Sequence, residues 1–230
     1  MPNNNRPIYS HLALALIILA LTCSCSDETG FKGPVEMQLW DIVTYEGSTD
    51  GGDRSRFTFR QVDDSPLITL ISPTLLPAET TAGTRMIIRY IPESGEAYTS
   101  GNITLLSAAR VNQSPVATEW KEEFDNWNRD KVYLYSVWRT GNHLNFHVRL
   151  TYDPEPRLFQ LAADPATIGT EYPDIYLVHI MASPTDYHDR AYFASFDIAG
   201  VWNSPQTKGI RLHVANTNLD QQEFTFVKDI

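Results

Sequence analysis

Residues 142–150 read NHLNFHVRL, and this stretch decides the class of fold. Its apolar positions are Leu144, Phe146, Val148 and Leu150, and the polar positions between them are Asn145, His147 and Arg149. Because successive side chains of a strand point to opposite faces, this period of two predicts a β-strand with one face in a core and the other toward solvent. The turn signal Thr140-Gly141-Asn142 predicts a hairpin with the preceding run.

Similar segments fill the rest of the C-terminal half. Further β-rich runs lie at 131–139, 157–163, 174–181, 190–199, 208–215 and 222–228. In the run at 208–215, Ile210, Leu212 and Val214 alternate with polar residues in the same way. Together with 142–152 these are seven short strands in about 100 residues, which predicts a roughly seven-stranded β-sandwich over residues 131–230.

The N-terminal half has a second set of short runs. They lie at 36–45, 56–62, 67–72, 85–91 and 102–111, separated by Gly, Pro, Asp and Ser. Five β-rich runs in about 80 residues predict a small β-barrel over residues 35–116, of the five-stranded OB-like type. The predicted fold class is therefore all-β, with an OB-like barrel followed by a sandwich.

Residues 117–130 are polar and charged, and we interpret them as a linker between two domains. Trp120, Phe124 and Trp127 are spaced four and three apart, so they would share one face of a short helix, which Thr118 could cap. The favoured interpretation is a connector that packs its aromatic side chains on the sandwich. The alternative is an aromatic platform for a ligand.

The composition excludes several classes of protein. The 230-residue chain has two cysteines, 42% hydrophobic residues and a formal net charge of −10. Two cysteines are too few for a small disulfide scaffold, and the apolar content is too high for a disordered chain. Residues 35–118 contain six Arg and no Lys against ten acidic residues, a net charge of −4. This charge argues against a nucleic-acid partner for the barrel.

Residues 1–25 have the pattern of a secretory signal. Arg6 precedes a dense apolar run at 12–21, and small residues follow it in Thr22-Cys23-Ser24-Cys25. About ten apolar residues cannot span a bilayer, which takes roughly 20. The stretch resembles a bacterial lipoprotein signal, in which a small residue precedes a lipidated cysteine. Ser24 is smaller than Thr22, so Cys25 is preferred to Cys23; an ordinary cleaved signal with two leftover thiols is the alternative.

A lipid on Cys25 would place the protein at a membrane. Several acyl chains anchor a protein stably, whereas a single chain binds reversibly. Residues 26–34, SDETGFKGP, are interpreted as a flexible tether, and their start Ser26-Asp27-Glu28 resembles the export tags of Bacteroidetes surface lipoproteins. The expected location is the outer membrane, with the periplasmic and cell-surface faces both open.

The order of the motifs resembles that of NigD-like lipoproteins of Bacteroidetes. The motifs are Gly83-Thr84-Arg85-Met86-Ile87-Ile88-Arg89-Tyr90, Gly141-Asn142-His143-Leu144-Asn145-Phe146, Tyr176-Leu177-Val178-His179 and Phe193-Ala194-Ser195-Phe196-Asp197. The resemblance covers nearly the whole chain and implies a lipoprotein signal, an OB-like domain and a C-terminal sandwich. It implies no catalytic residue, because each motif is a strand with its turn. The family takes its name from a bacteriocin operon, which suggests a role in immunity.

Few residues suggest chemistry. Ser195 and Asp197 share one face of a strand, and with His179 they would make a nucleophilic triad, but no nucleophile-elbow motif surrounds Ser195. His143 and His147 have the spacing of a helical zinc pair, yet on a strand they lie about 13 Å apart, so we interpret them as solvent-facing. Asp50-Gly51-Gly52-Asp53 and Asp186-Tyr187-His188-Asp189 are interpreted as loops. No catalytic residue, metal or cofactor is predicted.

Aromatic side chains are the remaining candidates for binding. Tyr133, Tyr135 and Trp138 in the first sandwich strand and Trp40 in the barrel could stack on sugar rings. Simple alternation places Tyr133 and Tyr135 opposite Trp138, so these three should not form one platform, and core packing is the favoured interpretation for most of them.

We therefore predict a lipid-anchored envelope protein that is not an enzyme and that binds another envelope protein or a glycan. The alternatives are bacteriocin immunity, a structural subunit of a surface assembly, and a hydrolase using His179, Ser195 and Asp197. The one site residue that the sequence assigns is Cys25, for lipidation.

Overall fold

The computed structural model describes residues 37–49, 51–153, 155–182 and 188–228. The signal at 1–25, with Cys23 and Cys25, and the tether at 26–34 lie outside the described residues, as do Asp50, Asp186 and Tyr187. Residues 36–230 form one compact unit. Within the described part of the chain, no helix is long and apolar enough to cross a membrane.

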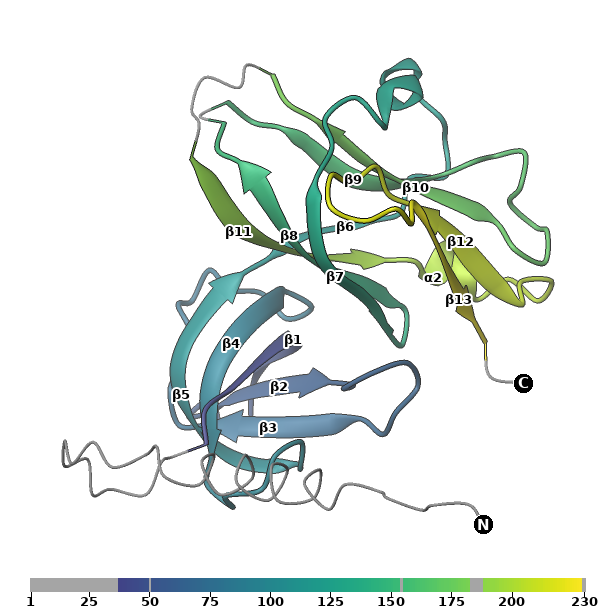
Figure 1. The fold of residues 1–230 in the computed structure, drawn as a ribbon. Coiled ribbons are helices and arrows are strands. Elements are labelled where there is room, and N and C mark those ends of the chain that lie inside the picture. The colour runs from purple at the N-terminus through teal and green to yellow at the C-terminus, as the bar shows by residue number, and fades with distance from the viewer. Residues whose placement is uncertain (1–36, 50, 154, 183–187, 229–230) are drawn as a thin grey trace, which may run out of the picture. The chain divides into compact units, whose positions relative to one another are not determined.

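The N-terminal strands close into a barrel (Figure 1). The strands are β1 (Leu39–Ser48), β2 (Ser55–Phe59), β3 (Ile68–Ser72), β4 (Arg85–Pro92) and β5 (Gly101–Arg110), in the order β1-β2-β3-β5-β4. Only the β3–β5 pairing is parallel, and β4 pairs with β1 to complete the closure. The predicted five-stranded OB-like barrel is confirmed.

Alternating side chains fill the barrel. Val43, Phe57, Leu70, Ile88 and Ile103 each lie in its core with at most 1% of their surface exposed. Gly47 adopts φ +93° at an irregularity in the β1–β2 pairing, a backbone conformation that only glycine adopts without strain. The inward positions of β1 also include Asp41, whose carboxyl group accepts a hydrogen bond from the buried Tyr90.

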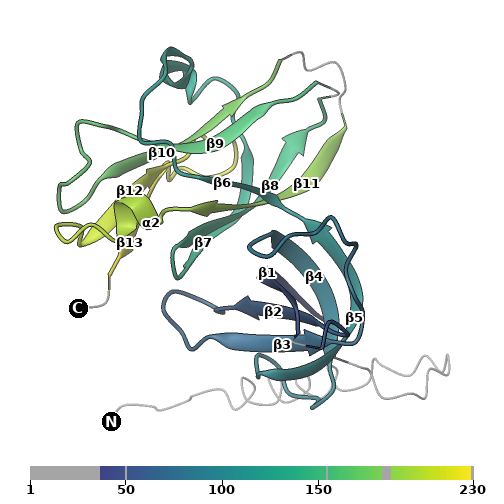
Figure 2. The same cartoon turned by 180° about the vertical axis from the view of Figure 1, so that it is seen from behind.

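Two four-stranded sheets make the sandwich, and Figure 2 shows them from behind. One sheet has the order β6-β11-β8-β7, from β6 (Asn112–Pro115), β11 (Asp189–Asp197), β8 (His143–Thr151) and β7 (Tyr133–Thr140). The other has the order β13-β12-β10-β9, from β13 (Glu223–Val227), β12 (Gly209–His213), β10 (Asp174–Ile180) and β9 (Leu158–Ala163). All seven predicted runs are strands, so the all-β prediction is confirmed.

The eighth strand, β6, was not expected. Its sequence Asn-Gln-Ser-Pro is polar, and it pairs in parallel with β11, far along the chain. Val111 alone separates β6 from the last barrel strand, so the chain passes from β5 straight into the sandwich sheet.

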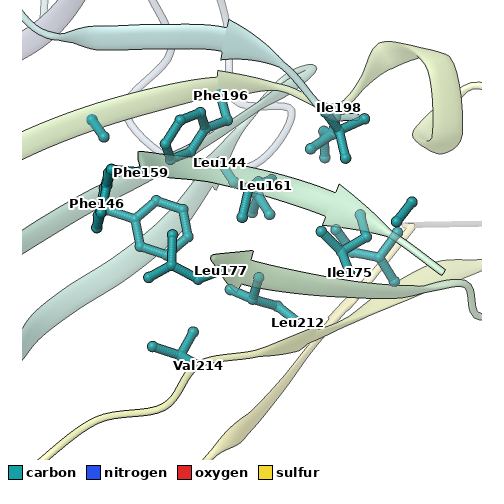
Figure 3. Packing of buried hydrophobic residues seen from close by; sticks show 14 of the residues in the cluster. Leu144, Phe146, Phe159, Leu161, Ile175, Leu177, Phe196, Ile198, Leu212 and Val214 are labelled. Atoms are coloured by element: carbon teal, nitrogen blue, oxygen red, sulfur yellow. The ribbon is translucent and has the colours of Figure 1, made fainter. Parts of the chain in front are cut away.

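Large apolar side chains meet between the two sheets. Figure 3 shows Phe146 and Phe196 from one sheet beside Phe159, Leu161 and Leu177 from the other. Phe146 and Phe196 pack at 5.7 Å between ring centres, and both are fully buried. Burial of this kind contributes roughly 25 cal/mol per Å² of apolar surface, which makes this core the main source of the sandwich's stability.

The connector between β6 and β7 packs on the outer face of the β9–β10 pair. It contains a 3₁₀ helix, η1 (Glu122–Asn126), whose buried Phe124 contacts Ala162 and Val178. Trp120 and Trp127 pack around Phe124 at its rim, which confirms the predicted packing of these aromatic residues on the sandwich. The predicted cap was wrong: the residue before η1 is Lys121, with no side-chain cap, because the helix begins later than Thr118 would require.

Candidate functional site: an aromatic strip and cleft

The hypothetical catalytic triad does not exist. His179 lies on β10 and Ser195 on β11, in opposite sheets. The His179 ring bonds the Asp130 carbonyl oxygen through Nδ1 at 2.7 Å and lies 3.3 Å from Arg157 through Nε2. Ser195 Oγ donates to Asn145 Oδ1 at 2.8 Å, and Asp197 accepts the Ala199 N–H. Each group is therefore committed to another partner, and the hydrolase hypothesis was wrong.

His143 and His147 are less exposed than the solvent-facing positions that the sequence predicts. Both rings are half-buried. Burial and the charge of Arg85 lower the pKa of His143 to about 4, and burial lowers the pKa of His147. Both imidazoles are thus neutral at neutral pH. Within the described ranges, no group of three or more His, Cys, Asp or Glu could hold a metal ion.

A β-bulge overturns the prediction that Tyr133 and Tyr135 oppose Trp138. Opposite β8, Leu134 pairs with Val148 and Ser136 pairs with His147, so Tyr135 is an extra residue in β7. One extra residue reverses the parity of the strand beyond it. Leu134 and Val137 therefore both turn into the core, although they are three apart, and Trp138 comes to the same outer face as the two tyrosines.

The outer face of this sheet carries four rings in a row, which we call the aromatic strip: Tyr133, Tyr135, His147 and Phe193. Neighbouring ring centres lie 5.0 Å, 4.5 Å and 4.3 Å apart along this order. The last pair stacks face to face, with an interplanar angle of 11°. Tyr135 is 48% exposed, so the strip is open to a ligand at its middle. The sequence alone could not predict the whole strip, because Phe193 and His147 meet only through the pairing of β8 with β11.

The strip continues into a cleft of about 310 Å³, which we call the aromatic cleft. Its apolar lining is Trp40, Ile42, Phe59, Ile87, Trp138 and Phe193, and its polar lining is Asp41, Arg60, Gln61 and His147. Trp40 is 59% exposed, and the Arg89 guanidinium lies 5.4 Å from the centre of its ring. Trp40 and Trp138, two of the candidates for stacking on a sugar ring, thus line the same cleft although they come from different sheets.

Electrostatics at the cleft are mild. The Asp41 carboxyl accepts a hydrogen bond from the Tyr90 hydroxyl at 3.0 Å. Burial raises the pKa of Asp41 to about 6, against the opposing effect of that bond. Arg149 stacks at 4.1 Å on Tyr133 and pairs with Asp189 at 3.3 Å. Flat rings beside amide, carboxyl and guanidinium groups suit a ligand with both apolar faces and hydroxyl groups.

The fold defines a class of protein: an OB-like barrel followed by an eight-stranded sandwich. No protein-family model matches the sequence, and no curated protein matches it. The fold is similar to that of a protein of unknown function (DUF1344) from Bacteroides vulgatus, with a TM-score of 0.62 and 17% identity over 84% of this chain and 91% of that one.

Two further solved structures share this fold. A NigD-like immunity protein from Bacteroides caccae has a TM-score of 0.55 and 17% identity over 86% of this chain and all of its own. A candidate lipoprotein from Bacteroides fragilis has a TM-score of 0.55 and 15% identity over 84% and 96%. The predicted likeness to NigD-like proteins is thus confirmed at the level of the fold, and none of these three structures is described as an enzyme.

Proposed function

We propose that this protein is a non-enzymatic binding module of the bacterial envelope whose ligand is a glycan. The observation that carries the proposal is the aromatic strip, which opens into the aromatic cleft. Large contiguous apolar patches are rare on the surface of monomeric soluble proteins, and they are typical of interaction sites. A sugar ring offers an apolar face to stack on Tyr135 or Trp138 and hydroxyl groups for Gln61 and Arg60.

The glycan proposal is tested by two substitutions and a control. We expect soluble polysaccharides of envelope and host origin, screened by affinity electrophoresis, to retard the wild type. Tyr135→Ala and Trp138→Ala should each weaken binding of the same polysaccharide by about tenfold or more. Tyr98→Ala removes an exposed ring from a barrel turn and should leave the binding unchanged. Equal losses in all three variants, or no retardation by any polysaccharide, would refute the proposal.

We further propose that Cys25 carries the lipid that anchors the protein in the outer membrane. The support is the signal pattern of residues 1–25 and the fold shared with a candidate lipoprotein. Metabolic labelling with a fatty acid should be lost in Cys25→Ala and kept in Cys23→Ala. The opposite result would assign the lipid to Cys23, and labelling of both variants would argue against a single acceptor.

A bacteriocin-immunity role is the second candidate, and the shared fold with a NigD-like immunity protein favours it. Protection would be measured as the survival of a sensitive strain that expresses this protein against envelope-targeting bacteriocins. Survival that persists in Tyr135→Ala would separate immunity from the glycan surface.

A further inference from the structure

Arg85 is a buried cation held only by neutral oxygen atoms. It begins β4 with 4% of its surface exposed. Its Nε donates to Ser195 Oγ at 2.8 Å, and its two terminal nitrogens donate to Thr44 Oγ1 at 2.9 Å and Asn145 Oδ1 at 3.0 Å. These bonds use three of the roughly five N–H groups of a guanidinium. Burial lowers the Arg85 pKa only to about 10, so the group stays charged at neutral pH.

Buried charges in proteins are normally paired, and a second arginine of this chain follows that rule. Arg139, 1% exposed, bonds both carboxylate oxygens of Asp64 at 2.8 and 3.1 Å and lies 3.4 Å from Asp63. Within residues 37–228, the described positions give Arg85 no carboxylate partner. Among the described residues Arg85 therefore makes no ion pair, in contrast with Arg139, although Asp197 lines another pocket beside it.

A polar pocket of about 300 Å³ opens onto Arg85. A second guanidinium, that of Arg60, lines the same pocket and bonds only the backbone carbonyl oxygens of Asp64 and Ser65. Its polar lining also includes Asn142, the ring of His143 and three threonines, Thr44, Thr58 and Thr140. The one carboxylate at the pocket, Asp64, is already bound by Arg139. Two cations thus line a pocket whose one carboxylate, Asp64, makes its ion pair with Arg139 and feels the charge of Arg60 without bonding it.

We propose that this pocket binds an oxyanion group, a carboxylate, sulfate or phosphate, between Arg85 and Arg60. Guanidinium groups donate parallel hydrogen bonds to such groups, and charge-assisted bonds are about twice as strong as neutral ones. The Thr44 hydroxyl accepts a bond from Arg85 and keeps its own hydrogen, which it would donate to the oxyanion. The pocket size admits a small ion or the charged substituent of a larger molecule.

The observations that support the oxyanion pocket differ from those that support the glycan proposal. The two sites nevertheless adjoin, because Phe59 and Arg60 line both the pocket and the aromatic cleft. Because the pocket and the cleft adjoin, two possible sources of the oxyanion can be distinguished by how much of this surface they occupy. A free ion would occupy the pocket alone, whereas an acidic sugar would place its charged group in the pocket and its ring in the cleft.

The test is a titration of the purified full-length protein, with the ring resonances of His143 followed by NMR at constant ionic strength. The probes are sodium sulfate, phosphate, acetate and glucuronate, with chloride as the reference and glucose as the uncharged partner of glucuronate. We expect at least one oxyanion to shift the His143 resonances saturably, and chloride to leave them in place. If glucuronate binds more tightly than acetate, the source is an acidic sugar; if sulfate or phosphate binds most tightly, it is the free ion.

Matched variants decide between a site and general charge attraction. Arg60→Gln should weaken the oxyanion by about tenfold, the usual cost of one charge-assisted contact. Arg54→Gln, an exposed arginine outside the pocket, should change the affinity by less than about twofold. Arg85→Gln would disturb the fold because Arg85 is buried, so Thr44→Val is used instead: it removes a hydroxyl group from the same pocket, keeps the buried charge and should also weaken the oxyanion. Equal effects of Arg60→Gln and Arg54→Gln, or no saturable shift with any oxyanion, would overturn the proposal. Loss of polysaccharide binding in Tyr135→Ala would leave this result unchanged.

Discussion

Asp41 should make the barrel less stable as the pH rises. The carboxyl group lies on the inward side of β1, and its pKa is raised from 3.8 to about 6 by burial, the larger effect, against the hydrogen bond from Tyr90. Below about pH 4 the carboxyl is neutral in both the folded and the unfolded chain. Between about pH 4 and 6 the unfolded chain releases the proton while the folded chain keeps it, so the free energy of unfolding falls as the pH rises.

The size of this effect follows from the shift. A difference of about two pKa units is worth roughly 3 kcal/mol at neutral pH, at 1.36 kcal/mol per unit. Asp41→Asn keeps the shape and an acceptor for the Tyr90 hydroxyl but carries no charge. We expect it to raise the free energy of unfolding by about 1–3 kcal/mol at pH 7.5, since the amide accepts a weaker hydrogen bond than the carboxylate does. At pH 4 the same variant should match the wild type to within roughly 1 kcal/mol.

Urea denaturation at a series of pH values, followed by tryptophan fluorescence, measures this difference. Asp220→Asn is the control, because Asp220 is exposed and makes no hydrogen bond or ion pair among the described residues. The control should change the stability little at either pH. A stabilisation by Asp41→Asn that is equal at pH 4 and pH 7.5 would show that ionisation is not its cause. Destabilisation at pH 7.5 would refute the reasoning outright.

Two further predictions concern the sandwich. Burial is the largest cause that lowers the pKa of His179 from 6.5 to about 4. The stability that neutral His179 contributes is therefore complete above about pH 6.5 and is lost as the pH falls toward 4. His179→Gln should flatten this part of the pH profile of urea denaturation, and an unchanged slope would contradict the assignment of the slope to His179. Gly209→Ala should lower the free energy of unfolding by more than about 2 kcal/mol, because a new Cβ would meet the Phe226 carbonyl oxygen and the Tyr172 ring. Gly200→Ala is the control: its Cβ has open space, so the variant should be neutral or stabilising in the same thermal melt.

The strands were predictable where alternation and burial agree. In β8, Leu144, Phe146 and Val148 are all fully buried, as the period of two required. The same logic could not find β6, because its residues Asn112 to Pro115 carry no apolar face and are held by pairing with β11, which lies about 80 residues later. A strand whose partner is distant and whose side chains are polar leaves almost no local signal.

The candidate site was predictable only in part, for a related reason. The sequence named Tyr133, Tyr135 and Trp138, but a strict period of two put Trp138 on the wrong face. The signal for the bulge was present: the core residues Leu134 and Val137 are three apart, and this spacing fits a strand only if one residue is extra. His147 and Phe193 joined the strip through strand pairing, and the position of Arg85 against Ser195 depended on contacts 110 residues apart.

Cross-strand packing offers a purely structural explanation of the aromatic strip, and one substitution separates it from binding. Neighbouring aromatic residues on a sheet stabilise it by roughly 0.2–1 kcal/mol per pair, so Tyr135 could be present for stability alone. Tyr135→Thr keeps a residue that favours strands but removes the ring. Because Tyr135 is 48% exposed, its ring adds little to the core, and we expect the variant to lose less than about 1 kcal/mol of unfolding free energy while polysaccharide binding falls about tenfold. A larger loss of stability with unchanged binding would assign the ring to the sheet, and the glycan surface would then have to lie elsewhere.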